Sequence, residues 1–203
     1  MKKILNIISS VQGNESFSNK LSGAILEKLA AAYPGSTVHT RDLTKKPFPH
    51  LEESHFTAFY TPDEARTEEH REAVKHSDAA INEIKDADII VIGVPLYNLG
   101  IPSTLKSWID HIVRRGVTFS YTEAGVLEGL VKNKKVYLAI ASGGVYSEGP
   151  MKSYDFTESY LRTIFGLIGI TDITTFRVEG HFKAETKETA LPKALGAVEE
   201  YAY

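Results

Sequence analysis

The fold is decided by one stretch near the start of the chain, Ile4-Leu5-Asn6-Ile7-Ile8-Ser9-Ser10-Val11-Gln12-Gly13-Asn14-Glu15-Ser16-Phe17-Ser18-Asn19. It begins with a short apolar run rich in β-branched side chains, which predicts a strand buried on both faces. A loop of small and hydroxylated residues follows. Apolar residues then recur at helical spacing, at Leu21, Ile25, Leu26 and Leu29. We therefore expect a strand, a loop and a helix in direct succession.

The loop between this strand and this helix is suited to bind a phosphate group. Backbone N–H groups and the positive end of the helix dipole converge where a helix starts. Hydroxyl donors could come from Ser9, Ser10, Ser16 and Ser18. Alternatively, these serines only shape the loop, and Ser16 or Ser18 caps the helix. Taken alone, the stretch leaves both interpretations open.

Several familiar phosphate-site motifs are absent from this loop. It has no G-x-x-x-x-G-K-[ST], so a nucleoside triphosphate would find neither the lysine nor the Mg²⁺ hydroxyl. It has no G-x-G-x-x-G, which argues against a dinucleotide held by the first turn. No acidic pair follows the strand, as a phospho-acceptor receiver domain would need. The pattern favours a single terminal phosphate held by hydroxyls and amides.

Composition predicts a single globular domain over residues 1–203. Hydrophobic residues make up 42% of the chain and charged residues 24%, which is typical of soluble proteins. The net charge of −3 and the lack of a polybasic run argue against a nucleic-acid or membrane surface. No stretch approaches the roughly 18 apolar residues of a membrane span, and the N-terminal residues lack the apolar core of a signal peptide. We expect a cytoplasmic protein.

The sequence offers no metal-binding pattern. It contains no cysteine, which excludes disulfides, thiolate catalysis and thiolate metal sites. His70 and His76 lie in a charged segment of helical pattern and have no third ligand at metal spacing. We interpret both as solvated helix residues and expect no bound metal.

The rest of the chain predicts a regular alternation of strands and helices. Strands are expected over residues 37–40, 88–94, 135–141 and 170–178, and helices over 63–86, 103–115, 154–168 and from about 184. The first, third and fourth strands are almost continuously apolar, as in a parallel sheet covered on both faces. We expect a doubly wound α/β fold with a five-stranded parallel sheet in the order 2-1-3-4-5 and helices on both faces.

Two segments interrupt this alternation. Residues 46–62 contain several prolines and form a long loop for a compact domain, which indicates a surface cover or a partner contact. Aromatic residues in this loop, Tyr60 among them, either touch a ligand or only pin the loop to the body. Residues 116–134 have no strong helical pattern and predict a protruding hairpin or lid.

Loops after the first, third and fourth strands meet where the strand order reverses, which is where such sheets bind ligands. The loop after the third strand offers Leu96 and Tyr97 to flank a flat ring, and Asn98 to bond its edge. In the loop after the fourth strand, Gly143-Gly144 lets the backbone approach a ligand closely. Each segment could instead be a plain turn. Together, a phosphate site and a ring site describe flavin mononucleotide (FMN).

The chain also carries a set of specific blocks, namely Ser9-Ser10, Ser16-Phe17-Ser18-Asn19, Arg41-Asp42-Leu43, Pro95-Leu96-Tyr97-Asn98, Ile101-Pro102-Ser103, Leu105-Lys106, Gly116-Val117-Thr118-Phe119, Tyr121 and Gly166-Leu167-Ile168-Gly169-Ile170. With these blocks the sequence resembles the FMN-dependent azoreductase and NADH:quinone oxidoreductase family, which has a flavodoxin-like fold. The resemblance extends over nearly the whole chain.

The resemblance implies a tightly bound FMN and a set of residues around it. Its phosphate and ribityl end would contact Ser10, Ser16, Phe17 and Ser18. Its ring would be lined by Pro95, Leu96, Tyr97, Asn98 and Leu99, with Ala141, Ser142, Gly143 and Gly144 at the far edge. The family forms homodimers with two sites at the interface. This implies that Phe119 and Tyr121 reach the partner's flavin, and that Tyr60 and Tyr146 also border the substrate slot.

Two departures limit what the resemblance carries over. Many members have Ser-Arg-Gly-Gly and a histidine where this chain has Ala141-Ser142-Gly143-Gly144 and Tyr146. Tyr60 stands where some members have an arginine. Both changes remove positive charge or a titrating group near the ring. The physiological acceptor and the choice between NADH and NADPH are therefore left open.

The resemblance also implies a ping-pong reaction in which NAD(P)H passes a hydride to N5 of FMN and a quinone or azo compound then takes two electrons. The cofactor supplies this chemistry, so no catalytic side chain is required. Tyr146 is a candidate proton donor or ring contact, with plain packing as the alternative. Two rival functions are a flavodoxin-type electron carrier and a flavin-free binding module.

Overall fold

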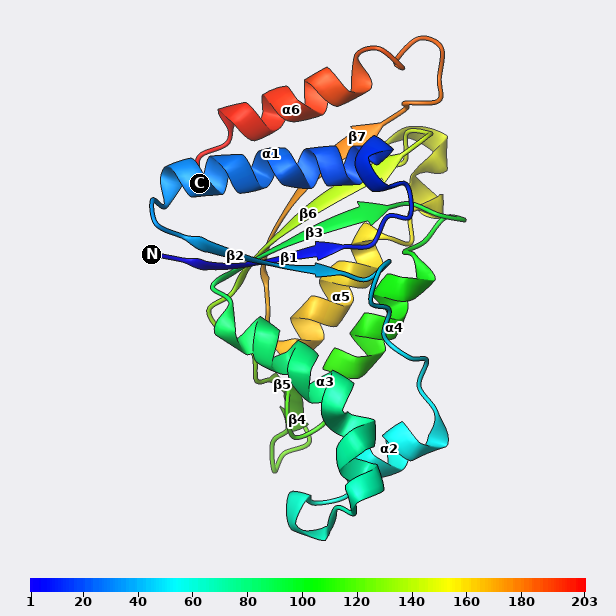
Figure 1. The fold of residues 1–203 in the computed structure, drawn as a ribbon. Coiled ribbons are helices and arrows are strands. Elements are labelled where there is room, and N and C mark those ends of the chain that lie inside the picture. The colour runs from blue at the N-terminus through cyan, green and yellow to red at the C-terminus, as the bar shows by residue number, and fades with distance from the viewer.

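A computed structural model of residues 1–203 shows a central sheet of five parallel strands (Figure 1). The strands are β1 (Lys3–Ile8), β2 (Thr37–Asp42), β3 (Ile89–Pro95), β6 (Lys135–Ser142) and β7 (Asp172–Glu179). Their order across the sheet is β2-β1-β3-β6-β7, which confirms the predicted order 2-1-3-4-5. Every residue of the central strand β3 is buried, whereas no residue of the edge strand β2 is. This difference explains why β3 is so much more apolar.

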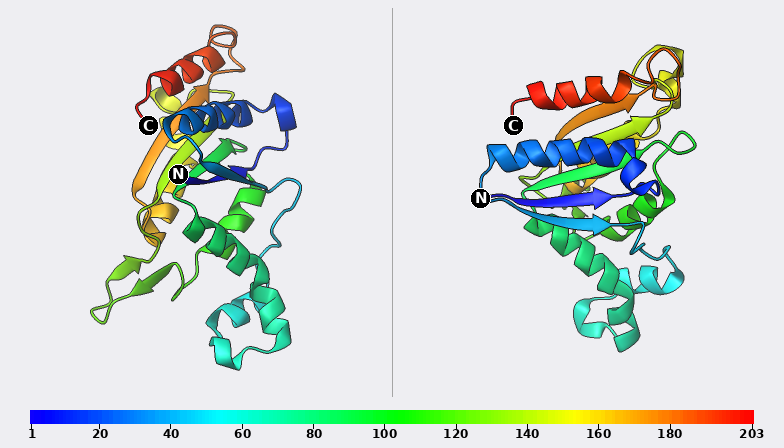
Figure 2. Two further views of the ribbon diagram at one scale, coloured as in Figure 1. Left: turned by 60° about the vertical axis from the view of Figure 1, so that its left-hand side comes forward. Right: turned by 45° about the horizontal axis from the view of Figure 1, so that its top comes forward.

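Helices cover both faces of the sheet, as predicted (Figures 1 and 2). The helices are α1 (Phe17–Ala32), α2 (Glu53–Tyr60), α3 (Glu68–Asp86), α4 (Ser103–Ile112), α5 (Glu158–Ile168) and α6 (Ala190–Glu200). On one face, α1 and α6 enclose a core that includes Ile25 and Val198. On the other, α3, α4 and α5 enclose a larger core around Trp108 and Phe165. None of these helices combines the length and apolar character needed to cross a bilayer.

The prediction of an irregular loop over residues 46–62 was wrong, because α2 lies within it. This helix has only eight residues and depends on tertiary packing, since His55 and Ala58 are buried. Nδ1 of His55 also accepts a hydrogen bond of 3.1 Å from the amide of Glu52, which stabilises the first turn. Neither contact is visible in a local apolar pattern.

Several helices start later than predicted. Short 3₁₀ turns, η2 (Asp63–Ala65) and η3 (Gly149–Tyr154), precede α3 and α5. The Asp155 carboxylate fixes the start of α5, because it accepts the N–H of Thr157 at 2.8 Å. The last helix begins at Ala190, and Pro192 stands in its first turn, where a missing N–H is tolerated.

The predicted hairpin is confirmed within residues 116–134. Strands β4 (Phe119–Tyr121) and β5 (Leu127–Gly129) pair in antiparallel fashion and project from the body (Figure 2). Gly129 lies so close to the end of α5 that a Cβ there would stand 2.2 Å from the nitrogen of Gly169. Gly169 itself has φ of 105°, a conformation that favours glycine. The base of the hairpin is therefore fixed to α5.

We expect Gly129→Ala to lower the free energy of unfolding by about 3 kcal/mol, the upper range for forced overpacking. The control is Gly23→Ala in α1, where a Cβ meets no atom within 4 Å. Removing a helix-interior glycine should stabilise the protein by about 0.5–1 kcal/mol. Urea-induced unfolding measures both changes. A Gly129→Ala protein as stable as the parent would contradict the close contact.

Residues around α2 fold back onto α3 and α4 at His111, which is fully buried. The ring centroid of His111 lies 5.5 Å from that of Phe48 and 5.2 Å from that of His55. Its Nε2–H donates to the Pro49 carbonyl oxygen at 3.0 Å. Burial lowers the pKa of His111 below its ordinary value of 6.5, and the proximity of His55 and His76 acts in the same direction. His111 is thus held neutral at neutral pH.

Because the pKa of His111 is lower in the folded chain, the unfolded chain binds a proton first as the pH falls below about 6.5. The contribution of neutral His111 should be complete above that pH and decline below it. We expect the free energy of unfolding to fall between about pH 7.5 and about pH 5.5, and to fall less for His111→Gln. Urea titrations at both pH values measure this. Equal losses in the two proteins would contradict the assignment.

Candidate functional site

Loops that follow β1, β3 and β6 surround a cavity of about 170 Å³ at the carboxyl edge of the sheet. Its lining includes nine of the residues predicted to contact a cofactor, namely Ser16, Phe17, Ser18, Pro95, Leu96, Tyr97, Ala141, Ser142 and Gly143. The structure therefore brings the three predicted loops together at one place. Four others, Ser10, Asn98, Leu99 and Gly144, lie in the same loops but do not line this cavity.

The loop between β1 and α1 presents several hydrogen-bond donors at the start of the helix. Ser16 and Ser18 are buried, and their hydroxyl oxygens lie 2.9 Å apart. Ser16 Oγ also accepts the N–H of Asn19 at 3.2 Å, so Ser16 both caps the helix and lines the cavity. The amides of Phe17 and Ser18 make no hydrogen bond within the chain. Free amides and hydroxyls at a helix start are suited to bind an anion.

Ser9 and Ser10 tie this loop to β3 and to the loop that follows it. The Ser9 hydroxyl donates to the carbonyl oxygen of Gly93 at 2.7 Å. The Ser10 hydroxyl lies 3.3 Å from the Tyr97 hydroxyl and accepts the N–H of Gln12. In this chain Ser10 therefore orients Tyr97, and its contact with a phosphate stays a prediction.

The loop after β3 turns sharply through two residues in the left-handed region. Tyr97 and Gly100 exchange hydrogen bonds of 3.0 Å in both directions, and φ is 49° at Asn98 and 69° at Leu99. For a leucine this conformation costs roughly 1–2 kcal/mol. Backbone strain of this kind is typical of ligand sites. The amides of Asn98 and Leu99 have no partner within the chain.

The loop after β6 is folded by its own polar groups. The Ser142 hydroxyl donates to the Gly144 carbonyl oxygen at 2.9 Å, and the same oxygen accepts the N–H of Gly180 at 3.0 Å. Ser142 thus closes the turn after β6. The amides of Gly143 and Gly144 make no hydrogen bond within the chain and are available to a ligand.

Three residues that line the cavity were missed by the sequence analysis, namely Gln12, His181 and Phe182. The ring of His181 stacks on Phe17 at a centroid distance of 4.3 Å. Burial lowers the pKa of His181 below its ordinary value. Phe182 is 81% exposed, yet it packs so closely on Gly143 that a Cβ there would meet its ring at 2.4 Å. His181 and Phe182 directly follow the fifth strand, whose carboxyl end lies at the same edge of the sheet. This position in the sequence was the signal that could have identified them.

Four predicted substrate-slot residues do not line the cavity of a single chain. Tyr60 lies on α2, where it is exposed and packs on Phe56. Phe119 and Tyr121 lie together on the protruding hairpin. The ring of Tyr146 packs beside Gly144. The placement of these residues at a site shared with a partner stays a prediction.

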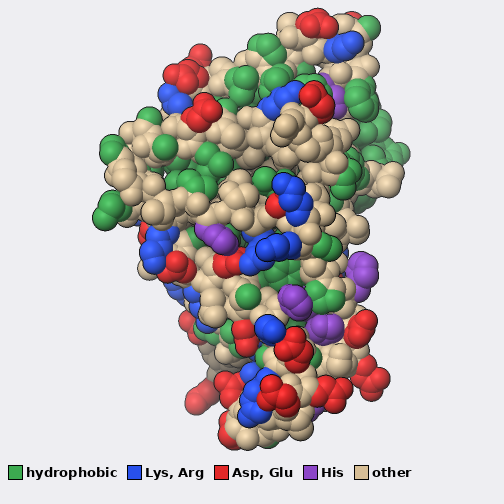
Figure 3. Space-filling model, viewed as in Figure 1, with side chains coloured by type: hydrophobic (Ala, Val, Ile, Leu, Met, Phe, Trp, Pro, Cys, Tyr) green, Lys and Arg blue, Asp and Glu red, His purple; other side chains and the backbone are tan.

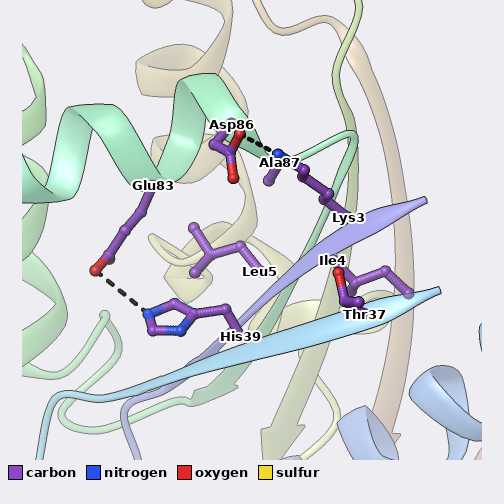
Figure 4. A pocket seen from close by; sticks show the side chains of 8 residues that line it. All are labelled: Lys3, Ile4, Leu5, Thr37, His39, Glu83, Asp86 and Ala87. Carbon is purple, nitrogen blue, oxygen red and sulfur yellow. Dashed lines mark hydrogen bonds and ion pairs between the residues drawn. The ribbon is translucent and has the colours of Figure 1, made fainter. Parts of the chain in front are cut away.

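A second cavity of about 350 Å³ lies between α3 and the first halves of β1 and β2 (Figure 4). Its charged groups pair with one another, because Lys3 bonds Asp86 at 2.6 Å and His39 lies 3.4 Å from Glu83. Glu83 also binds Arg41. None of the residues predicted to contact a cofactor lines this cavity, whereas nine of them line the cavity at the carboxyl edge, which is therefore the candidate site.

Comparisons with known proteins agree with this geometry. A family model described as a flavodoxin-like fold matches residues 2–202. The FMN-dependent NADH:quinone oxidoreductase of Herminiimonas arsenicoxydans is 47% identical over 201 residues, which cover 98% of each chain. The protein of the same name from Beijerinckia indica is 44% identical over 200 residues, again covering 98% of each chain.

Solved structures give the same result. The azoreductase from Bacillus anthracis str. Sterne has a TM-score of 0.87 and 32% identity, covering 99% of this chain and all of that one. An FMN-dependent NADH-azoreductase from Bacillus anthracis str. Ames Ancestor, in complex with FMN, has a TM-score of 0.84 and 26% identity over the full length of both chains. This chain therefore belongs to the family of FMN-dependent NADH:quinone oxidoreductases, which has a flavodoxin-like fold.

Proposed function

We propose that this protein is an FMN-dependent oxidoreductase that uses NADH or NADPH to reduce quinones and aromatic azo compounds by two electrons in a ping-pong reaction. One observation carries the proposal: three loops, distant in sequence, present unpaired amides and buried hydroxyls around one cavity. The names of the relatives support the choice of cofactor and electron donor.

The residues around the cavity fit FMN. Ser16 and Ser18, with the amides of Phe17 and Ser18, would bind the phosphate by charge-assisted hydrogen bonds. Leu96 and Tyr97 would orient the ring. The cavity is smaller than the roughly 300–1,000 Å³ of typical ligand sites. We expect the exposed side chain of Phe182 to swing aside when the cofactor enters.

When bound, FMN supplies hydride acceptance from the nicotinamide and hydride transfer to the acceptor. The chain supplies binding and orientation. Unpaired amides of Asn98, Leu99, Gly143 and Gly144 would donate to polar atoms at the ring edge, where negative charge develops. The Tyr146 hydroxyl is a candidate proton donor or ring contact.

We also propose a homodimer with its two sites at the interface. Exposed aromatic side chains on α2 and on the hairpin support this proposal, since Tyr60 is 59% and Tyr121 51% exposed in the single chain. In the dimer these residues, with Phe119, would border the partner's substrate slot.

The alternative is a flavodoxin-type electron carrier, which would dock on a basic partner through an acidic surface. Charged groups of both signs are interspersed on the face seen in Figure 3, and the net charge is only −3. Both observations favour the enzyme over the carrier.

Turnover tests the enzyme directly. We expect FMN-loaded protein to oxidise NADH or NADPH in the presence of a benzoquinone or naphthoquinone. Double-reciprocal plots at several quinone concentrations should be parallel, because the two substrates use the site in turn. Loaded protein that oxidises neither nucleotide with any quinone would end the enzyme proposal.

Ser18→Ala tests the phosphate site. Losing a hydrogen bond to a charged group costs about 1.5–3 kcal/mol, so FMN should bind roughly 10- to 100-fold more weakly. Riboflavin, which lacks the phosphate, should bind parent and variant equally. The control is Ser22→Ala on the same helix, whose hydroxyl only donates to Asn19 O at 3.0 Å. Quenching of flavin fluorescence measures each affinity. Unchanged FMN affinity in Ser18→Ala would place the phosphate elsewhere.

A further inference from the structure

A partly buried cluster of charges lies beside the candidate site, at the end of β7 and the start of α5. The Arg177 side chain is 13% exposed and contacts three carboxylates. Its Nη2 lies 2.5 Å from Asp155 and 2.7 Å from Glu158, and its Nη1 lies 3.3 Å from Glu179. None of these residues lines the cavity at the carboxyl edge. The cluster can therefore act on a ligand there only through other groups.

Glu179 connects the cluster to the loop after β6. Its Oε1 accepts the amides of Tyr146 at 2.8 Å and Ser147 at 2.9 Å, and its Oε2 accepts the Ser147 hydroxyl at 2.5 Å. The next residue, Gly180, donates its N–H to the carbonyl oxygens of Ser142 and Gly144. The loops after β6 and β7 lie at the same end of the sheet (Figures 1 and 2). The end of β7 thus holds both ends of the loop that contains the unpaired amides of Gly143 and Gly144.

Asp155 connects the same cluster to the loop after β3. Its Oδ1 accepts the amides of Thr157 at 2.8 Å and Glu158 at 3.3 Å, which fixes the start of α5. Phe156, which lies between Asp155 and Thr157, donates its N–H to the Leu99 carbonyl oxygen at 3.1 Å. Leu99 is one of the two strained residues of the turn after β3. Arg177 therefore stands between two loops that border the cavity.

Within the cluster, Glu158 is held in its ionised form at neutral pH. Burial alone would raise the pKa of Glu158, but hydrogen bonds from Arg177, Thr175 and Arg162 outweigh it and hold that pKa below its ordinary value. A carboxylate that accepts hydrogen bonds from several donors is held in one orientation and does not readily rotate away from them.

We propose that Arg177 and Glu179 are positioning residues that hold the loops after β3 and β6 in place around the ring of the flavin. This inference rests on the proposed function, because the ring is what the two loops would enclose. The pair makes the amides of Gly143 and Gly144 point in set directions before the cofactor arrives. Preorganised donors of this kind stabilise developing negative charge without reorientation.

Glu179→Gln is the decisive variant. It keeps the size of the side chain but removes the charge that Arg177 and the loop amides share. We expect FMN and riboflavin both to bind about tenfold more weakly, because the loss concerns the ring and not the phosphate. We also expect a more negative midpoint potential of the bound flavin, since reduction adds negative charge that misaligned amides stabilise less. A merely structural role would not shift the potential.

Two further variants complete the test. Arg162→Gln is the matched control, because Arg162 binds Glu158 at 2.7 Å in the same cluster but contacts neither loop, so affinity and potential should stay as in the parent. Ser147→Ala removes one bond to Glu179 and leaves all charges in place. It should shift both quantities in the same direction as Glu179→Gln, by a smaller factor. If circular dichroism shows that Glu179→Gln does not fold, the result for Ser147→Ala decides whether the inference holds.

The outcomes separate this inference from the proposed function. A parent protein that binds neither FMN nor riboflavin removes the proposed function and the inference with it. A parent that binds both, with unchanged affinities and potential in folded Glu179→Gln and Ser147→Ala, overturns the inference alone. A loss restricted to FMN also overturns it, because that result would place the effect at the phosphate.

Discussion

Backbone N–H groups without partners at one edge of the sheet are the constraint on which the structure depends. A parallel sheet brings the carboxyl ends of its strands together, so the loops that leave this edge present their free amides at one place. In this chain the unpaired amides include those of Phe17, Ser18, Gly143 and Gly144. The buried hydroxyls of Ser16 and Ser18 stand beside the first two. An anionic ligand with a polar ring edge satisfies such a set.

Hydrogen bonds and ion pairs hold the loops that carry these amides and hydroxyls. The Ser9 hydroxyl fixes the first loop to β3, and Arg177 with Glu179 fixes the later ones to β7 and α5. Strain at Asn98 and Leu99 persists because the flanking bonds between Tyr97 and Gly100 over-determine the turn. The loops around the site are thus held in place before a cofactor binds. A protein prepares an electrostatic environment for a cofactor in this way.

Local patterns in the sequence predicted most of the architecture. Continuous apolar runs revealed β1, β3 and β6, and the alternation with helices predicted a parallel sheet covered on both faces. The convergence of the three loops followed from the rule that such sheets bind ligands at their carboxyl edge, where the strand order reverses. What escaped prediction depends on contacts between residues far apart in the chain. Helix α2 is held by packing around His55, and His181 reaches the cavity by stacking on Phe17. No local spacing encodes these contacts.

The close approach of Gly129 to Gly169 has an evolutionary consequence. Because the two backbones touch where neither residue has a side chain, the base of the hairpin cannot accept a larger residue at either position alone. The tip, residues 122–126, is exposed and makes no comparable contact. Insertions and substitutions can therefore accumulate at the tip while the base keeps its place. A lineage built on this scaffold can diversify the hairpin without rebuilding the domain that carries it.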